Sequence, residues 1–439
     1  MTFSNLRLLL PFCGMLLICW LVIAYQASAN IAQPDIVDSS EQAIYPSSAL
    51  DSSAAPLDSD ATSSTSSLVL GAENTSVYLA SLRGKRVGLI VNQTSMLYQH
   101  ENNAAVSNPI HLVDVLRSYS INVTVMFAPE HGVRGNKGAG EHISSGKDAA
   151  TLIPIQSIYG KNKTPPNSIM ENLDVIIFDI QDVGTRFYTY ISSMHHMMQA
   201  AAQHKVAFMV LDRPNPNGEF IDGPVLDLAF QSFVGMHPIP VLHGLTVGEL
   251  ALMIKGENWI DNAEQLALTV IPMQGYHKSL VYNLPVPPSP NLPNYQAVRL
   301  YPSLCFFEAS AVSIGRGTDF PFQVTGHNKV RLGDFTFTPV SKPFAAPKPK
   351  LLDLALFGLN LQHSEIQGLD LRLLIDYHKA FKAQNIPFFT APEFMDKLAG
   401  TDTLRKAIEN GESLEDIRLS WQYDLALYKK MRLPYLLYP

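Results

Sequence analysis

Cysteine is scarce in this chain of 439 residues, which contains three. Cys13 and Cys19 lie in an apolar N-terminal segment, so Cys305 alone remains if that segment is removed. One cysteine cannot form an internal disulfide, which excludes a small disulfide-stapled scaffold. Hydrophobic residues make up 46% of the chain and charged residues 16%, enough for a sizeable core and, at this length, for two folded domains.

Basic residues are also few, with 32 Lys and Arg against 39 Asp and Glu. Removing residues 1–29 deletes Arg7 and no acid, which leaves 31 bases against 39 acids and a net charge of −8. Nucleic-acid affinity depends on basic side chains that neutralise phosphates. The composition therefore argues against a nucleic-acid partner, and nothing in it indicates an oligomeric state.

Long apolar runs are confined to the N-terminus. Arg7 precedes an apolar run from Leu8 to Ala24, and Ala27-Ser28-Ala29 follows as an A-x-A cleavage signature. We predict a secretory signal at residues 1–29 and an exported protein, periplasmic or extracellular. An uncleaved anchor is the alternative, because the run approaches spanning length. After cleavage, no stable membrane insertion is expected.

The next segment, residues 30–70, has few apolar side chains and no base. It contains eleven serines and six acids, as in "LDSSAAPLDSDATSSTSS". Such a composition cannot bury enough apolar surface to offset the entropy of ordering. We predict a disordered tether there.

Several catalytic signatures are absent. The chain has no P-loop, no G-x-S-x-G elbow and no H-E-x-x-H, and its "GNKGAGEH" does not match a dinucleotide fingerprint. No cofactor is expected. The repeated Glu-His pair, Glu130-His131 and Glu141-His142, leaves a metal site open as a weak alternative.

The body of the chain alternates β-branched runs with helical stretches. The strand-like runs are "RVGLIV" (86–91), "INVTVMFA" (121–128), "LDVIIFDI" (173–180), "VAFMVLD" (206–212) and "LALTVIP" (266–272). This alternation predicts an α/β fold with a mainly parallel sheet covered on both faces. We place this domain at residues 71–283. A proline-rich stretch then leads to a smaller α+β domain at 284–439, which begins with strand-like "SAVSIG" (310–315).

Polar side chains follow the predicted strands, at the edge where a doubly wound sheet binds ligands. The candidates are Asn92, Glu130, His131, Asp179, Asp182, Arg186, Tyr188, Arg213 and Asn215. A carboxyl group among aliphatic strand ends is suited to donating a proton, and Glu130 in "FAPEHGVRG" is our candidate. Spacing alone leaves open that Glu130 is a solvated loop acid and that His131 caps a helix.

A glycine-rich turn in the second domain, "SIGRGTDFPFQ", exposes Arg316 and Asp319. Glycines on both sides of Arg316 let the backbone approach a ligand closely. An internal Arg316–Asp319 ion pair explains the same spacing equally well.

Taken in order, the motifs resemble those of the exo-acting β-N-acetylmuramidases of the NamZ type, once a domain of unknown function. The matching stretches are "PEHGVRG", "FDIQDVGTRFYTY", "DRPNP", "HGLTVGELA", "PPSPNLP", "YPSLCFFEASAVSIGRGTDFPF" and "FTPV". The family often reads "GRPNP" where this chain has Asp212-Arg213-Pro214. The resemblance runs from about Ser81 to the C-terminus.

This resemblance implies a Rossmann-like domain, a smaller C-terminal domain and an active site between them. It implies an enzyme that releases N-acetylmuramic acid from the non-reducing end of peptidoglycan fragments, so the partners are peptidoglycan-derived saccharides. It assigns the catalytic glutamate of P-E-H-G to Glu130.

A glycosidase needs a second group besides the acid. Asp179, Asp182, Glu308, Asp319 and the acetamido group of the substrate all stay open for that role. For the lactyl carboxylate of muramic acid we favour Arg316 with Arg186, and Arg213 is the third candidate. A non-catalytic muropeptide- or sugar-binding protein is the alternative function.

Overall fold

The computed structural model describes residues 68–439 except 99, 102–103, 106–107, 136–145 and 161–162. The predicted signal at 1–29 and almost all of the predicted tether lie outside the described residues. Within the described part of the chain, no helix is both long and apolar enough to cross a bilayer.

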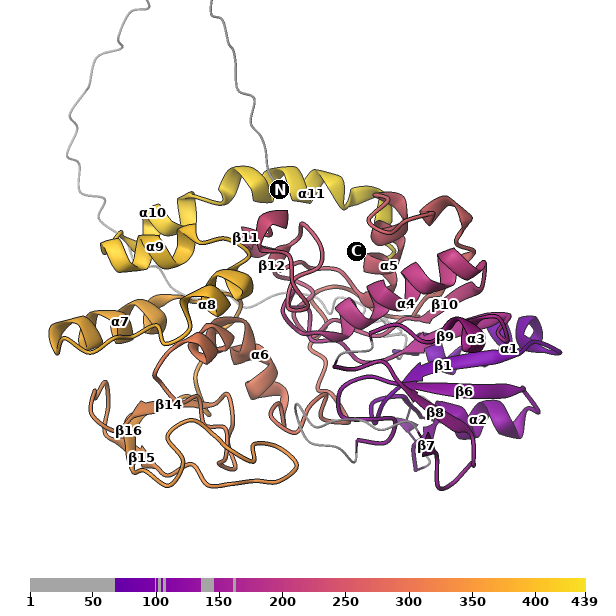
Figure 1. Ribbon diagram of the computed structural model, residues 1–439, viewed down its shortest axis with the longest axis horizontal. Coiled ribbons are helices and arrows are strands. Elements are labelled where there is room, and N and C mark those ends of the chain that lie inside the picture. Colours follow the sequence, from indigo (N-terminus) through magenta and orange to yellow (C-terminus); the bar gives the residue numbers. More distant parts are fainter. Residues whose placement is uncertain (1–67, 99, 102–103, 106–107, 136–145, 161–162) are drawn as a thin grey trace, which may run out of the picture. The chain divides into compact units, whose positions relative to one another are not determined.

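The central element is a seven-stranded sheet with the order β13-β10-β9-β1-β6-β8-β7 (Figure 1). Its strands are β1 (Val87–Val91), β6 (Val123–Ala128), β7 (Gly146–Lys147), β8 (Pro154–Ser157), β9 (Val175–Asp179), β10 (Ala207–Leu211) and β13 (Leu268–Ile271). All pairings are parallel except that of the edge strand β7 with β8. The first three parallel strands run outward from β1 to one side and the next three to the other, which is the Rossmann order.

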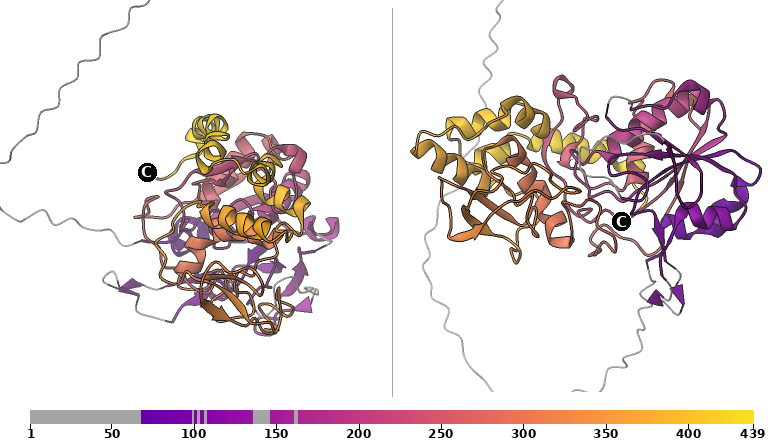
Figure 2. Two further views of the ribbon diagram at one scale, coloured as in Figure 1. Left: turned by 90° about the vertical axis from the view of Figure 1, so that its left-hand side faces the viewer. Right: turned by 60° about the horizontal axis from the view of Figure 1, so that its bottom comes forward.

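Helices cover both faces of this sheet, as the right-hand view of Figure 2 shows. Alternate residues of each strand point to opposite faces, so neighbours such as Leu89 and Ile90 belong to different hydrophobic clusters. The helices α1 (Thr75–Leu82) and α2 (Leu112–Ser118) pack on the Leu89 face. On the Ile90 face lie α3 (Asn167–Met170), α4 (Tyr190–His204) and α5 (Val247–Gly256). The predicted parallel sheet with two covered faces is confirmed.

Residues beyond the proline-rich stretch form a helical region around a small antiparallel sheet. The sheet has the order β14-β16-β15, from β14 (Val324–His327), β15 (Phe335–Phe337) and β16 (Leu356–Asn360). The helices are α6 (Tyr295–Leu304), η4 (Cys305–Ala309), α7 (Arg372–Ala383), α8 (Pro392–Ala399), α9 (Thr403–Asn410), α10 (Leu414–Leu419) and α11 (Gln422–Met431). This is the α+β composition that we expected.

The strand expected over "SAVSIG" was wrong. Ser310 and Ser313 make only isolated bridges, to Phe389 and Gly326. The chain turns at Gly315, whose φ of +80° ends any extended run.

Short two-stranded antiparallel sheets lie in the loops between the larger elements. They pair β2 (Met96–Leu97) with β5 (Ile110–His111), β3 (His100–Glu101) with β4 (Ala104–Ala105), and β11 (Asp222–Val225) with β12 (Pro240–Leu242).

One hydrophobic cluster joins the sheet to the C-terminal region. The cluster on the Ile90 face continues through Leu300 of α6, Leu374 of α7 and Leu425 of α11. In Figure 1, α11 runs from the C-terminal helices toward α5. Beyond it, the Tyr438 hydroxyl donates to Asp212 Oδ2 at 2.7 Å, at the end of β10. The C-terminal end of the chain therefore contacts the first domain at the end of β10.

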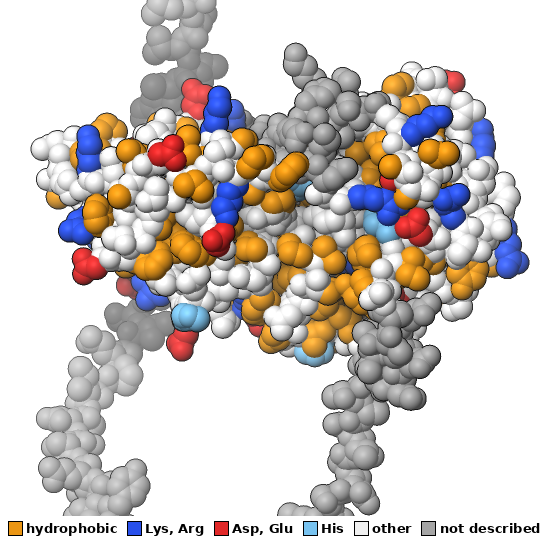
Figure 3. Space-filling view, turned by 90° about the horizontal axis from the view of Figure 1, so that it is seen from below, with side chains coloured by type: hydrophobic (Ala, Val, Ile, Leu, Met, Phe, Trp, Pro, Cys, Tyr) orange, Lys and Arg blue, Asp and Glu red, His pale blue; other side chains and the backbone are white. Residues whose placement is uncertain are grey.

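Charged side chains of both signs are interspersed among hydrophobic and neutral ones on the face in Figure 3. On the right-hand part of this view, Lys and Arg side chains lie beside acidic ones.

Candidate active site

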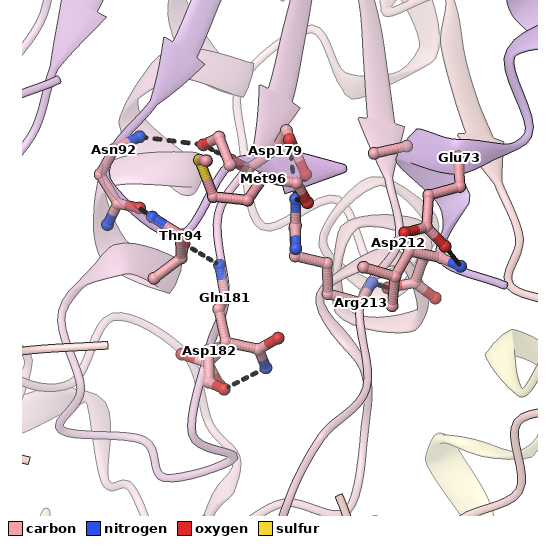
Figure 4. Close-up of polar contacts among 12 residues, drawn as sticks. Glu73, Asn92, Thr94, Met96, Asp179, Gln181, Asp182, Asp212 and Arg213 are labelled. Carbon is pink, nitrogen blue, oxygen red and sulfur yellow. Dashed lines mark hydrogen bonds and ion pairs between the residues drawn. The ribbon is translucent and has the colours of Figure 1, made fainter. Parts of the chain in front are cut away.

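The strand order reverses between β1 and β9, and side chains that follow β1, β9 and β10 lie close together there (Figure 4). Asn92 Oδ1 accepts from the Thr94 backbone N–H at 2.8 Å, and Thr94 Oγ1 accepts from the Gln181 N–H at 3.0 Å. Ser95 Oγ donates to the Asp179 carbonyl at 2.5 Å. Asn92, a predicted substrate contact, is thus buried in a network that ties the end of β1 to the end of β9.

Arg213 belongs to the same internal structure. Its guanidinium donates to both carboxylate oxygens of Asp179, at 2.5 and 3.0 Å, and both side chains are buried. The two-point geometry uses the fork of the arginine fully. Asp179 and Arg213 therefore neutralise each other at the strand ends, and neither lines the aromatic cavity beside Glu130.

Arg186 is also internal. Its guanidinium donates to the carbonyls of Pro224 (2.8 Å), Ile239 (2.6 Å) and Leu398 (3.0 Å). It contacts no carboxylate, and burial lowers its pKa to about 9. Arg186 therefore joins distant loops, and it is not among the residues that line the aromatic cavity beside Glu130.

Asn215 and Asp182 shape the loops that follow β10 and β9. Asn215 donates to the Leu245 carbonyl at 2.9 Å, and Asp182 Oδ2 accepts from the Gly184 N–H at 2.7 Å. The nearest ring nitrogen of His243 lies 4.0 Å from Asp182 Oδ2. Burial raises the pKa of Asp182 to about 7 and lowers that of His243 to about 3. Both side chains are buried, and neither lines the aromatic cavity beside Glu130.

Glu130 lies in the turn directly after β6. The turn closes with a bond from the Gly132 N–H to the Pro129 carbonyl, and His131 adopts a φ of +71° within it. Arg134 anchors the far side, with Arg134 Nε 2.9 Å from Asp148 Oδ1. The "PEHGVRG" motif is therefore a rigid turn that holds Glu130 at the strand end.

This turn opens onto a small cavity of about 110 Å³. Its walls are formed by residues from distant parts of the sequence: Glu130, His131, Phe187, Tyr188, Thr189, Tyr190, Ser289, Asn291, Leu292, Tyr301, Arg316 and Phe322. The Tyr188 hydroxyl donates to the Pro288 carbonyl at 2.8 Å, and its ring packs edge-on against Tyr190 and Tyr301. Four predicted site residues, Glu130, His131, Tyr188 and Arg316, thus share one aromatic cavity.

Two tyrosine hydroxyls lie near Glu130. Burial, and then the negative charge of Glu130, raise the pKa of both Tyr159 and Tyr190. The Tyr190 hydroxyl also donates to the Glu130 backbone carbonyl at 3.3 Å. Both tyrosines therefore stay protonated at neutral pH and can donate hydrogen bonds beside the Glu130 carboxyl group.

Across the cavity, Arg316 Nε donates to Glu308 Oε1 at 2.5 Å. The guanidinium also lies 5.0 Å from the centre of the Phe322 ring. Asp319 is instead 88% exposed and pairs with Lys342. The internal Arg316–Asp319 pair considered from spacing does not form, and Asp319 lies outside the cavity.

No group of three His, Cys, Asp or Glu side chains within the described ranges is placed to share a metal ion. Glu141 and His142, half of the alternative metal set, lie outside the described residues.

Sequence reasoning missed much of the cavity wall. Tyr190, Tyr301, Asn291 and Phe322 line the cavity but were not among our candidates. Each belongs to a stretch already quoted, such as "FDIQDVGTRFYTY" or "PPSPNLP". The density of aromatic residues in those stretches was the signal available.

Comparisons with known proteins bear on the whole chain. Residues 87–296 match the family model of exo-β-N-acetylmuramidase NamZ, N-terminal, and residues 299–438 match the NamZ C-terminal model. The chain belongs to the NamZ family. The peptidoglycan β-N-acetylmuramidase NamZ of Bacillus subtilis (strain 168) is 37% identical over 382 residues, which are 82% of this chain and 89% of that protein.

Two crystal structures of DUF1343 family proteins from Bacteroides fragilis share the fold. One is 41% identical with a TM-score of 0.74, and the other is 28% identical with a TM-score of 0.70. Each covers 85% of this chain and 99% of its own. Membership of the NamZ family confirms the predicted family and the prediction of a glycosidase.

Proposed function

We propose that this protein is an exo-acting glycosidase that releases N-acetylmuramic acid from the non-reducing end of peptidoglycan fragments during cell-wall recycling. Its membership of the NamZ family supports this activity. The observation that carries the site is that Glu130 and Arg316 line one small aromatic cavity. The apolar faces of a sugar ring pack on aromatic side chains, while the carboxyl and guanidinium groups supply a proton and a positive charge.

In this proposal, Glu130 protonates the glycosidic oxygen as the bond to the anomeric carbon breaks. The turn after β6 and the bond from the Tyr190 hydroxyl to the Glu130 carbonyl hold its backbone, and the Tyr159 hydroxyl orients its carboxyl group. Positioning of this kind aligns the donor with the leaving oxygen before reaction.

Three of the carboxylates considered as the second catalytic group are poorly placed for it. Asp179 is paired with Arg213, Asp182 is buried, and Asp319 is at the surface. Glu308, which borders the cavity through Arg316, is our candidate carboxylate. The acetamido group of the substrate is the alternative nucleophile. If Glu308 is the second catalytic group, Glu308→Gln should lose turnover, and added azide should restore it and give a glycosyl azide. Unchanged turnover in the variant would favour the acetamido group as the nucleophile.

Arg316 is our candidate for recognition of the lactyl group. Of the three arginines considered, it alone lines the cavity, and its bond to Glu308 runs through Nε rather than through a terminal nitrogen of the guanidinium. Arg316→Ala should therefore lose the preference for muramic acid over N-acetylglucosamine glycosides, as well as activity. Lys342→Ala, at the surface pair with Asp319, is the control. An Arg316→Ala enzyme that still discriminated the two sugars would refute this role.

The N-terminal signature supports a further part of the proposal, that the protein is exported and acts in the periplasm or outside the cell. Fractionation of cells that produce the full chain should place it there with residues 1–29 removed. Cytoplasmic material with an intact N-terminus would contradict it.

The exo activity is tested with a defined chain of alternating N-acetylmuramic acid and N-acetylglucosamine, labelled at its reducing end. Free N-acetylmuramic acid should appear first, while the labelled fragment shortens by one sugar. Internal fragments would indicate endo cleavage instead, and binding without any product would favour a non-catalytic protein.

A further inference from the structure

A second, larger cleft adjoins the aromatic cavity. Its volume is about 580 Å³, and it is lined by Glu308, Val312, Ser313, Ile314, Arg316 and the stretch Ala345 to Lys350. The stretch reads "AAPKPK", and the proposed reaction makes no use of it.

The aromatic cavity and the cleft share part of their lining. Arg316 lines both of them. Asn291, on the aromatic cavity, donates through Nδ2 to the carbonyl of Ala345, on the cleft, at 2.8 Å. Arg316 therefore lies at the border between the aromatic cavity and the cleft.

The lining of the cleft differs from that of the cavity. Three cations face it, Arg316, Lys348 and Lys350, against one acid, Glu308, which is already paired with Arg316. Lys350 is held by backbone carbonyls, including those of Phe307 and Ser310, whereas Lys348 is exposed.

None of the described residues around the cleft is aromatic, and the remainder are small or aliphatic. An apolar wall with an excess of positive charge suits a short acidic peptide better than a neutral sugar, which gains from aromatic rings.

We propose that this cleft binds an acidic peptide attached to the lactyl group of the muramic acid, so that the enzyme accepts peptide-bearing fragments. The inference rests on the proposed function. Arg316 lies at the junction, where its guanidinium binds the free lactyl carboxylate of a peptide-free sugar or donates to the amide carbonyl of a peptide-bearing one, and Lys348 faces the carboxylates of the peptide.

Two variants test the cleft at residues that do not themselves line the aromatic cavity. Ala345→Trp fills it from a half-buried position, and Lys348→Glu reverses an exposed charge. Lys429→Glu, an exposed reversal on α11, is the matched control for net charge. Thermal unfolding of each variant establishes that it is folded, and Lys348→Glu carries the test if Ala345→Trp does not fold.

The substrates are the disaccharide of N-acetylmuramic acid and N-acetylglucosamine, without peptide and with a tripeptide containing glutamic acid. Wild type should cleave both. Ala345→Trp and Lys348→Glu should raise KM for the peptide-bearing disaccharide by about tenfold, equivalent to about 1.4 kcal/mol, and change the peptide-free KM by less than about twofold. Lys429→Glu should change neither.

The inference is overturned if wild type cleaves only the peptide-free disaccharide, or if both cleft variants leave the peptide-bearing KM unchanged. Equal losses on both substrates would also overturn it, because they would assign the cleft to the leaving sugar. Failure of wild type to cleave either disaccharide would instead refute the proposed function.

Discussion

Replacing Arg213 distinguishes a structural arginine from a substrate-binding one. In Arg213→Met, the Asp179 carboxylate keeps its position at the end of β9 but loses both hydrogen bonds, at 2.5 and 3.0 Å. It stays fully buried, so water cannot replace the lost partner. Methionine fills most of the volume of the arginine stem, which limits any cavity effect.

The magnitude follows from leaving one charge buried without its partner, which costs about 3–5 kcal/mol. The folded region has about 370 residues, and its entropy of unfolding near the melting temperature is about 0.8 kcal/mol/K. The melting temperature should therefore fall by about 4–6 °C. Removing both charges, in Asp179→Leu with Arg213→Met, should recover most of the loss because no charge then remains buried.

Urea unfolding of wild type, of Arg213→Met and Asp179→Leu alone and of the double variant gives the four free energies of this cycle, and kinetics at a temperature where all are folded give the second readout. KM for a muramic acid glycoside should stay within about twofold of wild type, since a change of that size is under about 0.5 kcal/mol. An Arg213→Met protein as stable as wild type, with a KM raised tenfold or more, would show that Arg213 contacts substrate and would refute the structural role.

Three further predictions concern ionisation and surface contacts. Burial raises the pKa of Asp182 to about 7, so the folded state retains a proton that the unfolded state loses from about pH 4 upward, and the free energy of unfolding should fall as pH rises through that window. Asp182→Asn should remove this fall. Its free energy of unfolding should exceed that of wild type by on the order of 4 kcal/mol at pH 8 but by little at pH 4. Urea titrations that show equal gains at both pH values would contradict this prediction. Tyr438→Phe removes the hydroxyl that bonds Asp212, and calorimetry should show a loss of about 1–3 kcal/mol; no loss would mean that the C-terminal tail is not anchored there. Asp319→Ala breaks only the exposed pair with Lys342, so stability should change by less than about 0.5 kcal/mol and turnover should be unchanged, whereas a large drop in turnover would return Asp319 to the site.

The sheet was largely predictable because buried parallel strands are continuous runs of aliphatic and β-branched residues. Val87–Val91 and Val175–Asp179 are buried at every position, and their sequences show it. The strand Pro154–Ser157 was not predicted, since it begins with proline and contains two polar residues among four. It pairs in parallel only through β6, a tertiary effect that a local pattern does not reveal.

The candidate site was predictable in composition but not in arrangement. Arg186, Arg213 and Arg316 have identical chemistry and all lie in polar motifs, yet only Arg316 lines the cavity. The partners that bury Arg186 include the Leu398 carbonyl, 212 positions away in sequence. Long-range contacts of this kind decide which arginine is internal, and neither spacing nor composition contains them.

The central claim is that the Glu130 carboxyl group protonates the departing sugar oxygen. It is tested most directly by the turnover of Glu130→Gln on two muramic acid glycosides, one with a nitrophenol leaving group and one with N-acetylglucosamine. Nitrophenolate leaves without protonation, so its glycoside should lose little, while cleavage of the disaccharide should fall by a factor of about 10²–10⁴. Equal turnover by wild type and variant on the disaccharide, or equal losses on both substrates, would contradict the assignment of Glu130 as the acid.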